Sequence, residues 1–204
     1  MKKYTQEEFD AIPVDENGIR HCPTGDYTAI SHFGEYCSFG AGCSFGECCS
    51  FGAHCSFGEC CSFGAACRFG ECCSFGAYCH FGAACRFGEC CSFGAACRFG
   101  VYCSFGSVCR FGEVCRFGEG CICEFGQFVS MLSAGGFGSC GRTTYFFLMS
   151  DGRICVRCGC FAGTLDEWAA KVKKAHGDSY IARAYLLLIP AVKTQFEMGG
   201  FFNG

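Results

Sequence analysis

Cysteine and histidine are the side chains of this chain that could do chemistry, because they bind metals, attack electrophiles and move protons. The 204 residues include 25 cysteines and 5 histidines. One cysteine recurs every six residues from Cys37 to Cys121, and four others directly precede a repeated cysteine: Cys48, Cys60, Cys72 and Cys90. In a solenoid with three hexads per turn, His54, Cys72 and Cys90 stack along one corner, and such side chains can hold zinc. Stacked side chains point in parallel rather than converge, so these three are weak metal candidates.

The elements that position these residues follow from a hexapeptide period. Fifteen consecutive F-G-x-x-C-x units run from Phe33 to Phe117, a period typical of a parallel β-helix. Within each unit Cys and Phe alternate with an outward Ser or Arg, as a short strand requires. The glycine after each Phe suits a turn with unusual backbone angles. The repeated cysteine is then a small apolar residue beside a large one, and disulfide ladders through the core are the alternative.

A bulky apolar residue, then glycine, then a small residue four places after the bulky one resembles the motif of the hexapeptide-repeat left-handed β-helix superfamily. The resemblance implies a mainly β fold: a left-handed, three-sided parallel β-helix with coils of 18 residues and about five coils here. A four-sided coil of 24 residues is the alternative. Many members are acyltransferases with a histidine near an extruded loop. No such loop interrupts Phe33 to Phe117, so His54 and His80 are expected to be surface variation, and acyl transfer is kept as an alternative function.

The outward positions sort into columns when they are spaced by 18 residues. One column reads Ser44, Ser62, His80, Arg98 and Arg116. Arginines also stand in the other two columns, and Arg68 and Arg86 are expected to pair with Glu71 and Glu89 across a corner. The predicted binding residues are Arg68, Arg86, Arg98, Arg110 and Arg116. They could bind a protein partner or a phosphate-bearing small molecule.

Three segments are predicted: an N-terminal cap at 1–32, the β-helix at 33–127 and a ββαα module at 128–204. Thr5 with Glu8, and Thr164 with Glu167, have the spacing of capping boxes. A glycine-rich connector at 133–141 leads to a hairpin, TTYFFLMS-DG-RICVRCGC, and two helices follow, the second at 179–198 with Pro190 inside it. The two cysteines of CVRC (155–158) would lie on opposite faces of a strand and serve packing.

Aromatic residues in the last module suggest self-association. Tyr145, Phe147 and Trp168 are expected to form a homo-oligomer surface, such as that of a dimer.

The bulk properties restrict the class of protein. Net charge is −3 and pI about 5.9, and the sequence shows no secretory signal or membrane span. We therefore expect a reducing cytoplasm and no membrane partner. Nucleic acid is not expected either, because the arginines are divided among faces and no exposed aromatic residues interleave with them.

The whole chain also resembles uncharacterised proteins of phages and mobile elements of gut anaerobic bacteria. The resemblance implies an accessory protein in a bacterial host cytoplasm. The function expected is therefore non-enzymatic, without a cofactor: inhibition or sequestration of a host protein, including a defence factor. A thiol-rich metal-binding protein is the remaining alternative.

Overall fold

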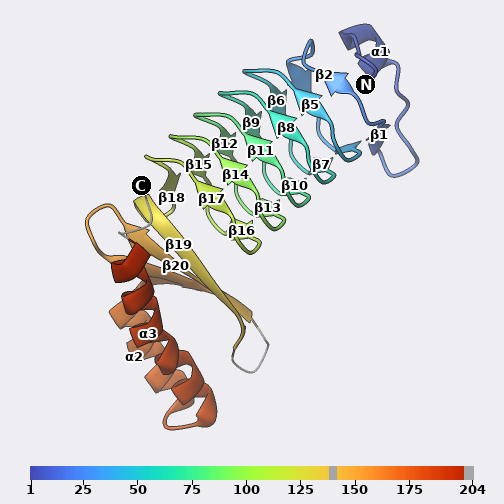
Figure 1. Cartoon of the computed structure of the whole chain (residues 1–204). Helices are drawn as coiled ribbons and strands as arrows, with labels where there is room; N and C mark the ends of the chain where they lie inside the picture. The colour runs from blue at the N-terminus through green and yellow to red at the C-terminus, as the bar shows by residue number, and fades with distance from the viewer. Residues whose placement is uncertain (138–141, 200–204) are drawn as a thin grey trace. The chain divides into compact units, whose positions relative to one another are not determined.

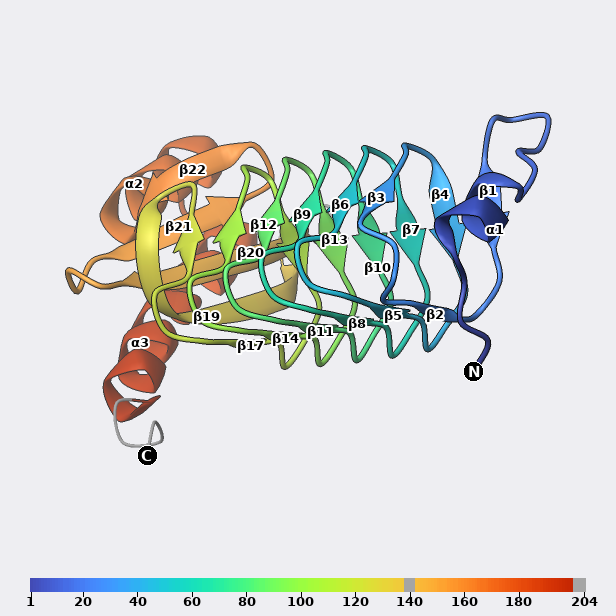
Figure 2. The same cartoon turned by 90° about the horizontal axis from the view of Figure 1, so that it is seen from above.

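The computed structural model describes residues 1–137 and 142–199 of the chain. The chain forms two compact units, Met1–Glu124 and Phe125–Gly204. The first unit is a solenoid of short parallel strands, and the second combines antiparallel strands with two helices. Figure 1 shows the short strands of successive coils stacked side by side, and Figure 2 shows the same strands from above.

Three parallel sheets wall the solenoid, so the predicted three-sided architecture is confirmed. The first sheet comprises β1 (Arg20–Cys22), β4 (Cys37–Phe39), β7 (Ser56–Phe57), β10 (Ser74–Phe75), β13 (Ser92–Phe93) and β16 (Arg110–Phe111). The second comprises β2 (Asp26–Tyr27), β5 (Ser44–Phe45), β8 (Ser62–Phe63), β11 (His80–Phe81), β14 (Arg98–Phe99) and β17 (Arg116–Phe117). The third comprises β3 (His32–Phe33), β6 (Ser50–Phe51), β9 (Arg68–Phe69), β12 (Arg86–Phe87), β15 (Ser104–Phe105) and β18 (Ile122–Cys123).

The solenoid begins earlier than the phenylalanine pattern indicates and has about six turns rather than five. The first coil is built from β1, β2 and β3, and its Tyr27 pairs in register with Phe45. Tyr27 is fully buried and stands where the repeat has phenylalanine. Because the repeat residue changes identity here, a search for F-G units misses this coil.

The core is a column of phenylalanine rings lined by cysteines. Phe75 stacks on Phe57 of the preceding coil, with ring centroids 4.9 Å apart and planes 3° apart. Within the same layer of the core, Phe75 meets Phe81 edge to face, with centroids 5.0 Å apart and planes at 88°. Both arrangements are favoured by the ring quadrupole. Three rings per coil therefore fit a three-sided cross-section, because each ring stacks along the axis and meets its neighbours by their edges.

The glycine of each F-G pair has a different role from the one predicted. The residue with positive φ is the second residue after that glycine, as at Cys60 and Tyr78, with φ of 58° and 61°. A Cβ built at Gly70 would lie 2.6 Å from the backbone nitrogen of Ala53 in the preceding coil. The glycine is therefore required by close stacking of backbones at the corner, and the left-handed position accepts many residue types.

Helix α1 (Gln6–Asp10) covers the first coil. Its predicted capping box is present, with the Thr5 hydroxyl accepting from the Glu8 amide and the Glu8 carboxylate accepting from the Thr5 amide. Phe9 of α1 is buried, and its ring meets Phe33 edge to face at 5.1 Å between centroids. The end of the core is thus closed by an aromatic side chain rather than left to solvent.

The second unit contains four antiparallel strands, β19 (Gly126–Phe137), β20 (Arg142–Met149), β21 (Ile154–Cys158) and β22 (Phe161–Thr164), followed by α2 (Leu165–His176) and α3 (Tyr180–Gly199). The predicted hairpin is β20–β21, and Gly152 in its turn has a φ of 83°. The predicted connector is wrong over 133–137, which belong to β19, and 138–141 lie outside the described residues. Helix α3 continues through Pro190.

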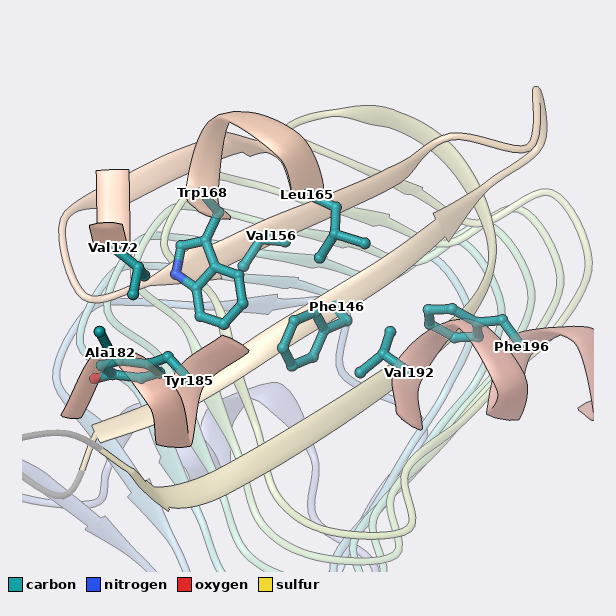
Figure 3. Close-up of a cluster of buried hydrophobic side chains, with 9 residues drawn as sticks. All are labelled: Phe146, Val156, Leu165, Trp168, Val172, Ala182, Tyr185, Val192 and Phe196. Atoms are coloured by element: carbon teal, nitrogen blue, oxygen red, sulfur yellow. The ribbon is translucent and has the colours of Figure 1, made fainter. Parts of the chain in front are cut away.

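The aromatic residues expected to mediate self-association are buried within the chain. Trp168 is 2% exposed and packs with Phe146, Val156 and Tyr185 in the core cluster drawn in Figure 3. Tyr145 and Phe147 are 8% and 4% exposed. These three side chains therefore leave no open aromatic surface of their own. Their expected role as a dimer surface is corrected, because the antiparallel strands and helices use them as core.

Candidate nucleic-acid interface

The repeated cysteines are enclosed in the solenoid wall. Cys79 is fully buried, and its Sγ donates to the carbonyl of Gly58 at 3.4 Å. The same bond, from each thiol to the glycine carbonyl 21 residues earlier, recurs from Cys55 to Cys121. Hydrogen bonds with Cys61 and Cys97, together with burial, raise the pKa of the Cys79 thiol well above its usual range. This thiol therefore stays protonated, as a packing residue does.

The outward column predicted from the 18-residue spacing is confirmed. His80 pairs in register with Arg98, and Arg98 with Arg116, on β11, β14 and β17. All three side chains are exposed. Asp26, Ser44 and Ser62 occupy the same column in the earlier coils. We call the outward side of β11, β14 and β17 the basic face, because positive charge gathers in these last coils of the column.

A hollow of about 130 Å³ lies on this face. It is lined by Tyr78, His80, Ala96, Arg98, Val114 and Arg116. Tyr78, Ala96 and Val114 come from the adjoining corner, where each has a φ near 60° that directs the side chain outward. Tyr78 is 57% exposed, so its ring can be approached from solvent. The hollow therefore combines the Tyr78 ring, the His80 imidazole, two small apolar side chains and two guanidinium groups.

The arginines of the basic face have no acidic partner in the described residues. Within residues 1–137 and 142–199, Arg98 and Arg116 form no ion pair, and the pairs of Lys2, Lys3, His21 and Arg153 lie elsewhere. The expected pairing of Arg68 and Arg86 with Glu71 and Glu89 is likewise absent there: the arginines stand on β9 and β12, and the glutamates stand in the corner turns that follow. Arg98 and Arg116 thus keep their hydrogen-bond donors available for a ligand.

The other predicted arginines lie on separate faces. Arg68 and Arg86 are register neighbours on β9 and β12 of the third sheet, and Arg110 follows Ser92 on the first sheet. All are exposed. The structure therefore brings Arg98 and Arg116 together with a hollow and separates them from Arg68, Arg86 and Arg110.

The weak metal candidates share one corner, as their spacing predicts. The His54 ring stacks on Tyr36 of the preceding coil, with centroids 5.0 Å apart and planes 9° apart. The amides of His54 and Cys72 donate to the carbonyls of Glu71 and Glu89 in the next coil. Within the part of the chain that the structure describes, no three His, Cys, Asp or Glu side chains converge as metal ligands do. The two cysteines of CVRC lie on β21, Cys155 buried and Cys158 half-buried.

None of the helices in residues 1–137 and 142–199 has the length and apolar character needed to span a membrane.

Comparison with known proteins gives one family match. The model of an RNA-binding, Nab2-type zinc finger matches residues 31–46, 49–64, 73–88, 90–106, 96–112 and 103–122. The matched segments lie within the solenoid and together cover less than half of the chain. No curated protein and no solved structure matches the chain.

This match contradicts the expectation that nucleic acid is not a partner, since the matched family binds RNA. Exposed aromatic residues are also present at the corners of the solenoid, contrary to expectation: Tyr36, Tyr78 and Tyr102 are 45%, 57% and 64% exposed. Tyr78 borders the basic hollow directly. The sequence signal was a tyrosine two residues before the outward histidine, in a corner position of the repeat.

The residues present do not fit a zinc ion of the kind held by zinc fingers. A structural zinc site needs four converging ligands, here three cysteines and a histidine. In the matched segment 73–88, Cys73, Cys79 and Cys85 point inward from three different walls, whereas His80 points outward. The matched segments 90–106, 96–112 and 103–122 contain no histidine. The resemblance therefore lies in the cysteine spacing and not in a shared ligand geometry.

Proposed function

We propose that this chain is a non-enzymatic nucleic-acid-binding repeat protein that holds single-stranded RNA on the basic face. The observation that carries the proposal is the hollow in which Arg98 and Arg116 stand in register beside the exposed ring of Tyr78. The family match supports RNA as the class of partner, because the matched family binds RNA. Proteins bind single strands by combining cationic side chains along the backbone with aromatic rings on which bases stack. The hollow contains both kinds of group within a few residues.

The arrangement suits a flexible strand better than a duplex. Neighbouring strands of a sheet are about 4.8 Å apart, so Arg98 and Arg116 present two guanidinium groups at that interval along the solenoid axis. Guanidinium groups bind phosphate oxygens through paired N–H donors. A base that leaves the backbone at this point can lie against Tyr78, because the ring borders the same hollow. Binding is therefore governed by charge and stacking rather than by the reading of base edges.

The test is fluorescence anisotropy of a labelled single-stranded RNA titrated with the full chain at several salt concentrations. The double variant Arg98→Glu, Arg116→Glu is compared with Arg68→Glu, Arg86→Glu, which makes the same charge change on another wall. We expect the first variant to lose at least tenfold in affinity. Because two phosphate contacts are lost, the slope of log affinity against log salt concentration should become shallower by about 1.4. The second variant should bind as the original chain does at moderate salt.

Equal affinities for the two double variants would overturn the placement of the site, and an original chain that binds no RNA would overturn the function. Circular dichroism and thermal melting of each variant show that the solenoid is intact. No contact of the described residues favours inhibition of a host factor or acyl transfer, and the hollow with its paired arginines favours nucleic acid.

A further inference from the structure

We propose that Cys72 and Cys90 form a surface dithiol that low-molecular-weight disulfides convert into a disulfide between neighbouring coils. This modification site is separate from the basic face and does not depend on RNA binding. The two cysteines belong to identical units, Phe69-Gly-Glu-Cys-Cys-Ser and Phe87-Gly-Glu-Cys-Cys-Ser, that follow one another after 18 residues. Identical units in successive coils place identical side chains directly above one another.

The backbone fixes the register of this pair. Ser74 and Phe75 pair with Ser92 and Phe93, and the Cys72 amide donates to the Glu89 carbonyl at 2.9 Å. Cys72 and Cys90 have the same backbone conformation, with φ of 57° and 58°. Their Cβ atoms therefore leave the corner in the same direction. Neighbouring strands are about 4.8 Å apart, which lies within the Cα separation of about 4.4–6.8 Å that a disulfide spans, and closure draws the two parallel Cβ atoms together to about 3.5–4.5 Å.

Contact and access distinguish these two thiols from the other cysteines. Both side chains are exposed, and the Cys90 thiol lies near enough to Cys72 to raise the pKa of the Cys72 thiol. Cys48 and Cys60 are also exposed, but Ala66 and Tyr78 take the corresponding corner positions in the next coil. The repeated core cysteines also stack, but they are buried and donate to glycine carbonyls. Among the described residues, only Cys72 and Cys90 are both exposed and stacked.

The chemistry is thiol–disulfide exchange with glutathione disulfide. One protein thiolate attacks a sulfur of glutathione disulfide and forms a mixed disulfide, and one glutathione thiol leaves. The second protein thiol loses its proton and attacks the protein sulfur of the mixed disulfide, releasing a second glutathione thiol. The protein dithiol is oxidised by two electrons, and glutathione disulfide is reduced to two thiols. Desolvation, Cys90 and Glu71 raise the pKa of the Cys72 thiol, and the exchange balances whichever of the two thiols attacks first.

The experiment treats the full, reduced chain with glutathione disulfide, blocks remaining exposed thiols with iodoacetamide, and analyses tryptic peptides without reduction. Cleavage after Arg68, Arg86 and Arg98 places Cys72 and Cys90 in different peptides, 69–86 and 87–98. We expect these two peptides to be joined, with a mass lower than their sum by two hydrogen atoms. Fragmentation then assigns the bond to Cys72 and Cys90 rather than to Cys73 and Cys91.

Matched variants decide the assignment. Cys72→Ser and Cys90→Ser should each abolish the joined peptide and leave a stable glutathione adduct on the remaining cysteine, whereas Cys48→Ser should leave the cross-link unchanged. Two separately alkylated cysteines in the original chain, a bond between other cysteines, or a disulfide between two chains would each overturn the proposal. Because these positions are exposed, a circular dichroism spectrum suffices to show that the serine variants fold.

Discussion

Gly70 lies against the backbone of Ala53, so that a Cβ added at Gly70 would stand 2.6 Å from the Ala53 nitrogen. The same contact recurs where later F-G glycines meet the corner of the preceding coil, as at Gly82 and Ala65. Gly34 is the exception in the repeat, because no heavy atom lies within 4 Å of the equivalent Cβ. Close stacking of coils therefore requires glycine at Gly70 and Gly82 but not at Gly34.

Gly70→Ala should therefore destabilise the solenoid, whereas Gly34→Ala should not. Overpacking of this kind costs about 1–3 kcal/mol, since backbone atoms have to move apart. The matched substitution Gly34→Ala adds the same methyl group into open space and should change stability by less than about 0.5 kcal/mol. Urea unfolding followed by circular dichroism measures both. Equal losses would show that backbone freedom, rather than close packing, selects glycine in the repeat.

Removal of Tyr78 should weaken RNA binding more than removal of Tyr102. Both tyrosines are exposed corner residues, at 57% and 64%, but only Tyr78 borders the basic hollow. Stacking of a base on an aromatic ring contributes about 1–3 kcal/mol, which is a factor of about 5 to 150 in affinity. Anisotropy titrations of Tyr78→Ala and Tyr102→Ala with the same RNA measure the difference. If both variants lose affinity alike, the ring at the hollow is not the stacking platform.

Chelation of zinc should leave both folding and RNA binding unchanged. Zinc fingers unfold without metal because the ion supplies their folding free energy. Here the repeated cysteines are buried against phenylalanine rings, and Cys79 donates to a carbonyl oxygen instead of presenting a thiolate. Thermal melting and RNA titration with and without 1,10-phenanthroline check this. A large drop in melting temperature would show that the cysteines hold a metal.

The capping box of α2 should make the second unit sensitive to acid. The Thr164 amide donates to the Glu167 carboxylate at 2.8 Å, and this bond, with the Thr164 hydroxyl, lowers the pKa of Glu167. A carboxylate with a lowered folded pKa contributes stability above its unfolded pKa, and that contribution is lost as pH falls through the folded value. Glu167→Gln should therefore be less stable than the original chain near neutral pH, and the difference should shrink in acid.

Fluorescence of Trp168, the single tryptophan of the chain, reports this unfolding because Trp168 belongs to α2 and its indole is buried. Thr164→Ala is the matched variant, since it removes the hydroxyl that accepts from the Glu167 amide and should cost about 1 kcal/mol. A stability difference for Glu167→Gln that is the same at every pH would contradict the role of the carboxylate charge.

The sequence predicted the solenoid well because its period is carried by residues whose roles are steric. Phenylalanine and cysteine at fixed intervals determine which side chains face inward, and the 18-residue columns of outward residues then follow, as the pairing of Arg98 with Arg116 shows. The first coil was missed because Tyr27 replaces phenylalanine. The strand at 133–137 was missed because glycines usually indicate a connector.

The candidate site was predicted only in part. The outward positions of Arg98 and Arg116 follow from the repeat, but the hollow depends on where the corner side chains turn. Tyr78 is directed outward by a positive φ that the repeat pattern does not reveal. The zinc-finger match shows a second limit of sequence patterns: the spacing of the cysteines does not reveal whether their side chains point toward one another.

The wall of the solenoid also sets a rule for how such a gene can change in length. Each coil offers the same backbone edge to the coil before it and the coil after it, as the pairing of Ser74 with both Ser56 and Ser92 shows. Duplication of three hexads would add one coil and leave every downstream residue on its original wall. Duplication of a single hexad would keep the core intact but turn all later positions by a third of a revolution, moving the two arginines of the basic face away from the serines beneath them. Selection for the interface should therefore tolerate insertions or deletions of eighteen residues and act against those of six.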